Sequence, residues 1–226
     1  RAPQYRNARG HSIQAWHKPV AQAPAWGRRA FLRWGAWAAL GGWSSVQAQT
    51  PALAVADMHS HYGMFLPRLF GLDLKAHLER TGTMLLAWSA TDDHRWIRST
   101  NSGWQQSRVP EPGELWQSFQ GRMAGYLRQI EQWALPKALV AADVDAALAG
   151  QPHVVLATEG ANFLEGDVSR VAVAHQWGVR HLQLLHFIQS PLGDHQTAQP
   201  RHGGLTPLGA QVVTECARLG IVVDLA

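Results

Sequence analysis

Five short apolar runs are separated along the chain by longer segments in which apolar residues recur at helical spacing. A short apolar run bounded by Gly, Pro or polar residues is typical of a strand that is buried on both faces of a sheet. We therefore predict five strands, over residues 53–61, 83–88, 153–157, 180–186 and 221–225.

The intervals between these runs predict helices over residues 73–80, 114–135, 138–148, 168–177 and 206–219. Asp73 and Thr206 are the expected N-caps of the first and last of these helices, and Gly220 is expected to end the last one. Residues 91–112 form a long polar stretch, rich in Ser and Trp, which we interpret as a functional loop.

The alternation of strands and helices predicts an α/β fold with a parallel sheet built from βα units. A (β/α)8 TIM barrel of the metal-dependent hydrolase type needs eight strands, so five strands correspond to about its first five βα units. The sequence stops directly after its last strand, which without a following helix would be bare on one face. We therefore expect the N-terminal part of a larger barrel.

The formal net charge of +4 arises in the first 48 residues. Seven of the 20 basic residues lie there and no acidic residue does, which leaves 13 basic against 16 acidic side chains in the rest of the chain. This balance provides no basic surface for a phosphate backbone, so nucleic-acid binding is excluded. The single cysteine, Cys216, excludes an intramolecular disulfide and is expected in the core.

Residues 28–33, Arg-Arg-Ala-Phe-Leu-Arg, closely resemble a twin-arginine export signature. An uncharged stretch over residues 34–46 and a small-residue cleavage site at residues 46–48 follow it. We therefore separate residues 1–48, an upstream segment with a twin-arginine signal peptide, from residues 49–226, the barrel part. The expected location is periplasmic or secreted, reached through the twin-arginine export machinery; the alternative is a membrane anchor that stays uncleaved.

Four polar side chains lie at the carboxyl ends of the predicted strands, where barrel enzymes build their sites. His59 and His61 are two residues apart on one strand, so both imidazoles point to the same side and can bind one metal ion. Glu159 follows the third strand and can bridge that ion to a second one. His186 ends the fourth strand and can hydrogen-bond a substrate carbonyl oxygen as negative charge develops there.

Each of these residues also has a structural interpretation. The two histidines can be ordinary polar residues at a strand end, Glu159 can cap the next loop, and His186 can be a hydrogen-bonded core histidine. Asp57 is expected to hydrogen-bond locally. The remaining histidines are given no role: His195 and His202 are expected to face solvent in a flexible loop, and His77, His175 and His181 to lie on helix or strand surfaces.

Four segments, in the same order and spacing, resemble the membrane (renal) dipeptidase family of zinc peptidases. They are residues 158–160 (Thr-Glu-Gly), 178–186 (Gly-Val-Arg-His-Leu-Gln-Leu-Leu-His), 204–209 (Gly-Leu-Thr-Pro-Leu-Gly) and 219–226 (Leu-Gly-Ile-Val-Val-Asp-Leu-Ala). The resemblance implies a (β/α)8 barrel that holds two zinc ions, cleaves small dipeptides and often forms a homodimer. It also implies that His59 and His61 are zinc ligands, that Glu159 bridges the metals, and that His186 contacts substrate.

Two features differ from that family. Its first motif usually reads His-x-Asp, whereas this chain has histidine at position 61, which removes one negative charge from the site. The family places a zinc-binding histidine directly after the Asp-Leu-Ala segment, and another histidine and an aspartate further on, which falls beyond Ala226.

The resulting hypothesis is an exported zinc dipeptidase in which a metal-bound hydroxide attacks the peptide carbonyl and His186 stabilises the oxyanion. The alternative hypothesis is another amidohydrolase-type reaction on the same scaffold, such as hydrolysis of N-acyl amino acids or lactones. His61 supports that alternative, because His-x-His is the commoner opening among those hydrolases. A third hypothesis is a non-catalytic half barrel that binds metal weakly.

Overall fold

The computed structural model describes residues 54–64, 73–91 and 93–225. These residues lie within one compact unit, Pro51–Ala226. The expected export signal and its cleavage site lie outside the described residues. Within the described part, no helix is long and apolar enough to cross a lipid bilayer.

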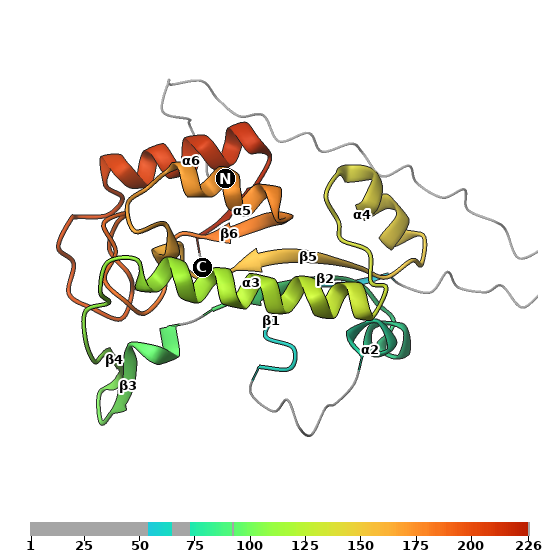
Figure 1. The fold of residues 1–226 in the computed structure, drawn as a ribbon, viewed down its shortest axis with the longest axis horizontal. Coiled ribbons are helices and arrows are strands. Elements are labelled where there is room, and N and C mark those ends of the chain that lie inside the picture. The colour runs from blue at the N-terminus through green and yellow to red at the C-terminus, as the bar shows by residue number, and fades with distance from the viewer. Residues whose placement is uncertain (1–53, 65–72, 92, 226) are drawn as a thin grey trace, which may run out of the picture. The chain divides into compact units, whose positions relative to one another are not determined.

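A five-stranded parallel sheet forms the centre of the fold, in the order β1-β2-β5-β6-β7 (Figure 1). Its strands are β1 Val55–Ser60, β2 Thr83–Ala90, β5 His153–Thr158, β6 Val179–Gln183 and β7 Val222–Asp224. Each strand of this sheet pairs with the next one along the chain, which is the connectivity of successive βα units. The predicted α/β fold with a parallel, partly formed barrel is confirmed.

The strand β6 ends earlier than predicted, at Gln183 instead of His186. Beyond Gln183, the amide of Leu184 still contacts the carbonyl of Asp224 at 3.4 Å, but the Leu184 carbonyl accepts a hydrogen bond from Ala161 in the loop after β5. The chain therefore leaves the sheet, and His186 lies on a loop that is held against the end of β5.

Helices occupy the intervals between the strands, close to the predicted ranges. They are α2 Leu74–Thr81, α3 Glu114–Gln132, α4 Ala141–Leu148, α5 Ser169–Gln176 and α6 Pro207–Leu219. The predicted N-caps are confirmed, because Asp73 accepts a hydrogen bond from the Ala76 amide and Thr206 from the Gly209 amide. The helix α4 begins three residues later than predicted because Ala138 pairs with β5 instead, through its amide and the Val154 carbonyl at 2.8 Å.

The main hydrophobic core lies between the sheet and the helices, and α3 supplies a large share of it. Trp88 of β2 stacks on Tyr126 of α3 with 3.8 Å between ring centroids, and Phe119 of the same helix stacks on Phe163 at 3.8 Å. Cys216 is fully buried, as predicted. This packing fixes the direction of the strands, so the side chains beyond their carboxyl ends are held on a rigid frame.

The polar stretch after β2 contains more structure than the predicted loop. Its elements are the 3-10 helix η1 (Asp93–Arg95) and an antiparallel hairpin of β3 (Ile97–Thr100) and β4 (Gly103–Gln106). Trp96 lies fully buried beneath the hairpin and donates a hydrogen bond to the Glu114 carboxylate at 3.2 Å. One buried indole thus anchors a hairpin whose own sequence is mostly polar.

Candidate metal centre

Three side chains converge at the carboxyl ends of β1 and β5, and their ligand atoms all lie within 4.8 Å of one another. They are His59 on β1, His61 directly after β1, and Glu159 directly after β5. The two carboxylate oxygens face different rings: Oε1 lies 3.3 Å from His59 Nε2, and Oε2 lies 3.1 Å from His61 Nε2. The structure therefore brings together all three predicted metal ligands.

The local backbone explains why these side chains meet. The amide of His59 donates to the Asp57 carboxylate at 3.1 Å, which is the local role expected for Asp57. The amide of Glu159 continues the sheet ladder by donating to the Ala90 carbonyl at 2.9 Å. The next residue, Gly160, has a φ of +87°, and a Cβ there would lie 3.1 Å from the Cβ of His186. A glycine at this point therefore allows the His186 loop to approach Glu159.

Hydrogen bonding by its other ring nitrogen orients His61. Its Nδ1 lies 3.3 Å from the carbonyl oxygen of Ser89, which also accepts a hydrogen bond from the Tyr126 hydroxyl at 3.1 Å. A carbonyl can only accept, so Nδ1 carries a proton, and Nε2 is the ring nitrogen that faces Glu159 and His59. Metal-binding histidines are commonly held by a carbonyl in this way.

The fourth predicted residue, His186, lies at the same place. Its Nε2 is 3.2 Å from Glu159 Oε1, and its Nδ1 is 2.9 Å from the carboxylate of Asp93. Asp93 also accepts a hydrogen bond from the amide of Phe187 at 2.9 Å, and both Asp93 and His186 are buried. Sequence reasoning missed Asp93; the available signal was its position in the polar stretch that follows the carboxyl end of β2.

The donor set fits a zinc ion. Imidazole nitrogens and a carboxylate oxygen are ligands that zinc prefers. His59 Nε2 and His61 Nε2 are 3.1 Å apart, close to the roughly 3.3 Å expected between two nitrogens bound tetrahedrally at zinc–nitrogen distances of about 2.0–2.1 Å. Glu159 turns one oxygen to each ring, which suits a carboxylate that binds or bridges cations.

Charge coupling within the cluster keeps Glu159 ionised. Burial raises the pKa of Glu159, but the hydrogen bond from His61 and the charges of the three histidines outweigh it and leave the pKa lowered. The pKa of His61 is raised, mainly by its hydrogen bond to Glu159, against the opposing effect of burial. The carboxylate is thus available as an anionic ligand at neutral pH.

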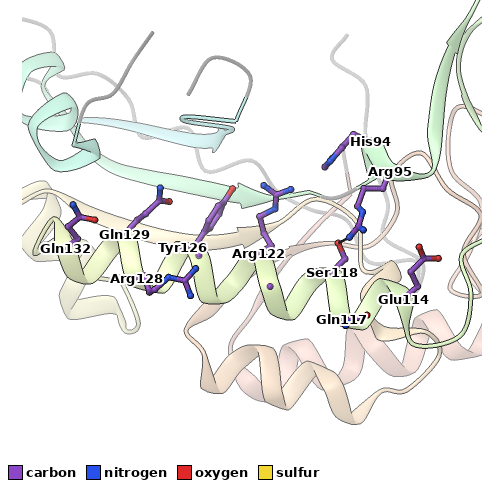
Figure 2. A pocket seen from close by; sticks show the side chains of 12 residues that line it. His94, Arg95, Glu114, Gln117, Ser118, Arg122, Tyr126, Arg128, Gln129 and Gln132 are labelled. Carbon is purple, nitrogen blue, oxygen red and sulfur yellow. Dashed lines mark hydrogen bonds between the residues drawn. The ribbon is translucent and has the colours of Figure 1, made fainter. Parts of the chain in front are cut away.

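A polar groove of about 1050 Å³ runs along α3 and is lined by Arg122 and Tyr126 among other residues (Figure 2). Figure 2 shows Arg122 and Tyr126 extending from α3 toward the neighbouring strand. The hydroxyl of Tyr126 reaches Ser89, and the charge of Arg122 slightly opposes protonation of His61. The helix therefore affects His61 in two ways: Tyr126 hydrogen-bonds the carbonyl that holds the ring, and Arg122 opposes the positive charge on it.

Two histidines differ from the sequence-based expectations. His195 was expected to face solvent but is only 8% exposed, because the Asp194 carboxylate folds its loop by accepting hydrogen bonds from the amides of Arg201, His202 and Gly204. These bonds hold the pKa of Asp194 down to about 2. His181 was expected on a surface but is buried, with Nε2 at 3.5 Å from the Asp224 carboxylate. His202 is exposed, as predicted.

Comparison with known proteins finds a family similarity in the C-terminal part of the chain. Residues 127–226 match the model of the membrane dipeptidases, peptidase family M19. Over these residues the chain is similar to the membrane dipeptidase family. The match includes Glu159 and His186, whereas His59, His61 and Asp93 precede it.

The dipeptidase aclJ of Aspergillus oryzae (strain ATCC 42149 / RIB 40) is 35% identical over 78 residues, which are 34% of this chain and 18% of that protein. A metallopeptidase from Rhodobacter sphaeroides, solved with a phosphinate mimic of the dipeptide L-Ala-D-Ala, aligns with a TM-score of 0.57 and 22% identity. That alignment covers 77% of this chain and 58% of the other. An amidohydrolase from Pseudomonas aeruginosa aligns with a TM-score of 0.54 and 18% identity, over 76% of this chain and 46% of the other.

The curated relative is matched over less than a fifth of its length, since the aligned segment spans 18% of it. At these identities the solved structures show the fold alone, and they agree with the partial barrel described above.

Proposed function

We propose that this chain carries part of the active site of a zinc-dependent dipeptidase, a hydrolase that cleaves the single peptide bond of a dipeptide. The observation that carries the proposal is the convergence of His59, His61, Glu159 and His186 at one edge of the sheet, in a chain with a membrane dipeptidase segment. Three of these side chains supply zinc ligands, and the fourth faces the same carboxylate.

Each residue of the cluster would have its own role in hydrolysis. Zinc held by His59, His61 and Glu159 would act as a Lewis acid on the peptide carbonyl and lower the pKa of the attacking water. Glu159 offers two oxygens that face separate rings, so it can bridge two ions. Since three side chains are too few for two complete zinc sites, a second zinc ion would need further ligands.

His186 is suited to stabilise the oxyanion. Its Nδ1 proton is directed to the Asp93 carboxylate, so a protonated Nε2 can donate to a carbonyl oxygen that gains negative charge. Asp93 is in turn fixed by the Phe187 amide, which leaves the imidazole little freedom to rotate. His186 is therefore assigned the substrate-contacting role and Asp93 a positioning role.

The test uses the natural gene product, read past codon 226, with zinc added or removed by a chelator. We expect hydrolysis of alanine-containing dipeptides that requires zinc, and loss of zinc and of activity in Glu159→Gln. Val109→Ala, a change at a 75% exposed position, serves as the control. A protein that binds zinc tightly and cleaves no dipeptide would contradict the assignment, and one without a tight metal site would favour a non-catalytic role.

A second candidate function is hydrolysis of N-acyl amino acids or lactones. The observation in its favour is His61, a neutral ligand where the family usually has aspartate, with its Nε2 at 3.1 Å from Glu159. Including N-acyl amino acids and lactones beside dipeptides in the same assay separates the two, because the preferred substrate has the higher kcat/KM.

A further inference from the structure

A pocket of about 520 Å³ lies between the β3–β4 hairpin and the loop that follows β6, outside the metal centre. The hairpin is the green element beside the orange loops in Figure 1. The residues that line the pocket are Trp104, Gln105, Gln106, Phe187, Gln189, His195, Gln196, Thr197, Ala198 and Gln199. This volume is within the usual range of small-molecule sites, about 300–1,000 Å³.

Hydrogen bonds hold the two walls of the pocket together. The side-chain oxygen of Gln106, on the hairpin, accepts from the amide of Gln189 at 3.0 Å. The side-chain nitrogen of Gln106 donates to the Arg108 carbonyl at 2.9 Å, and Arg201 donates to the Gln189 side chain at 2.7 Å. The pocket is thus a built feature that connects the hairpin to the loop carrying His186.

The pocket begins next to the proposed catalytic residue. Phe187 lines it and directly follows His186, with 4.1 Å between the centroids of the two rings. His195 lines it from the other side and is buried, and its Nε2 has no hydrogen-bond partner among the described residues. A substrate held by His186 would therefore have part of its structure within reach of this pocket.

The lining has a definite chemistry. It combines two aromatic rings, of which Trp104 is 51% exposed, with five glutamine side chains and a threonine. No lysine, arginine or carboxylate is among these lining residues. Burial lowers the pKa of His195 and so favours its neutral form. A charged group would meet no opposite charge among these lining residues, whereas their amide donors and acceptors can hydrogen-bond an uncharged polar group.

We propose that this pocket receives one side chain of the substrate and selects for uncharged, flat side chains, namely carboxamides and aromatic rings. The proposal rests on the proposed dipeptidase function. Trp104 and Phe187 supply the flat surfaces, and the amides of Gln189, Gln196 and Gln199 supply the hydrogen bonds. Acidic and basic side chains are rejected because nothing in the lining neutralises them.

The kinetic test compares the natural gene product with Trp104→Ala. Dipeptides with glutamine, phenylalanine, glutamate or lysine at either position are measured against Ala-Ala. We expect higher kcat/KM for the glutamine and phenylalanine dipeptides than for Ala-Ala, and a roughly tenfold loss of that preference, as the ratio to Ala-Ala, in Trp104→Ala. Val109→Ala changes an exposed residue of the same polar stretch (residues 91–112) that does not line the pocket, and this variant should keep the preference. Equal loss for all dipeptides, or an unchanged preference, overturns the proposal.

A binding test separates this proposal from the proposed function. Phosphinate dipeptide mimics with alanine, glutamine or glutamate side chains are titrated into the zinc-loaded protein by calorimetry. Tighter binding of the glutamine mimic that Trp104→Ala and Gln189→Ala abolish supports the pocket even if no dipeptide is cleaved, in which case only the dipeptidase function fails. Absence of binding, or equal binding of all three mimics in the unaltered protein, overturns the pocket.

Discussion

Among single residue contacts, the hydrogen bond between Asp93 and His186 matters most for the proposed reaction, because it holds the imidazole that is assigned to the oxyanion. An aspartate that accepts from a histidine Nδ1 fixes the tautomer and stabilises the positive charge that the ring can take up. Here the carboxylate and the imidazole are both buried, with 2.9 Å between them. The carboxylate acts through His186 and does not itself touch the metal ligands in the described contacts.

The first prediction concerns Asp93→Asn. Asparagine can keep the hydrogen bonds from His186 and the Phe187 amide, but it removes the negative charge that faces the imidazole. We expect kcat for the preferred dipeptide to fall about 10- to 100-fold with little change in KM. Zinc content should stay the same, since Asp93 is not a ligand. An unchanged kcat would show that Asp93 has no role in catalysis.

The second prediction is the pH dependence of stability in the zinc-free protein. The pKa of Glu159 is lowered from its ordinary 4.5, so its contribution is complete above that pH and is lost as pH falls through the folded-state value. The pKa of His61 is raised from its ordinary 6.5, so its contribution is complete below that pH and is lost as pH rises through the folded-state value.

The pair should therefore stabilise the zinc-free protein most between these two ordinary values, from about pH 4.5 to about pH 6.5. The free energy of unfolding, measured by urea titration across pH 4 to 8, should pass through a maximum in this window. Glu159→Gln should flatten the maximum. If the variant and the unaltered protein have the same pH profile, the ion pair does not contribute to it.

At the scale of the helices, two glycines differ in whether their surroundings leave room for a side chain. Gly209 lies in the first turn of α6, where a Cβ would lie 2.2 Å from the Leu192 carbonyl oxygen and 2.4 Å from Leu205 Cδ1. Gly121 lies in the interior of α3, where a Cβ would meet nothing within 4 Å. The first glycine is required by a close approach between the helix and the loop before it, whereas no such contact requires the second.

The third prediction follows from this difference. Gly209→Ala should lower the free energy of unfolding by about 1–3 kcal/mol because the loop must shift to admit the methyl group. Gly121→Ala should raise it by about 0.5–1 kcal/mol, since alanine is the better helix residue. Urea titrations of both variants check the signs. A Gly209→Ala variant that is not destabilised would contradict the packing described for α6, and a destabilised Gly121→Ala variant would contradict the open position described in α3.

Patterning along the chain predicts the elements well where their cause is local. The strand Thr83–Ala90 contains the continuous apolar run 84–88, and α6 has its cap, proline and terminal glycine in sequence. The polar hairpin after β2 was missed because its anchor is the distant contact of Trp96 with Glu114. The burial of His195 was missed for the same reason, since the bonds that fold its loop are made to Asp194 only once the chain has turned.

At the scale of the whole molecule, both the family match and the pairing of the strands lead to Glu159. The family match covers residues 127–226 and so includes Glu159 and His186. His59 and His61 lie before it, and their place in the site depends on the parallel pairing of β1 with β2 and of β2 with β5. Because strand ends meet at one edge of a parallel sheet, their meeting could be predicted from the sequence. Asp93 lies within a 3-10 helix after β2 and was not predicted, although it follows a strand end.

The fourth prediction concerns export, which we propose proceeds through the twin-arginine route. Its support is the sequence Arg-Arg-Ala-Phe-Leu-Arg at residues 28–33, followed by an uncharged stretch in a segment that has seven basic and no acidic residues. Replacing Arg28 and Arg29 together by lysine keeps the charge and changes only the paired guanidinium groups that the export machinery recognises.

In a bacterium that has this machinery, we expect the unaltered protein in the periplasmic fraction and the double-lysine variant in the cytoplasm, measured by fractionation and immunoblotting. Arg1 and Arg6, replaced by lysine in a matched control, should leave export unchanged because they precede the signature. If the Arg28/Arg29 variant is still exported, the segment is not a twin-arginine signal. The route also matters for the metal site, since this machinery carries folded proteins, and a ligand cluster assembled from β1 and β5 exists only after folding.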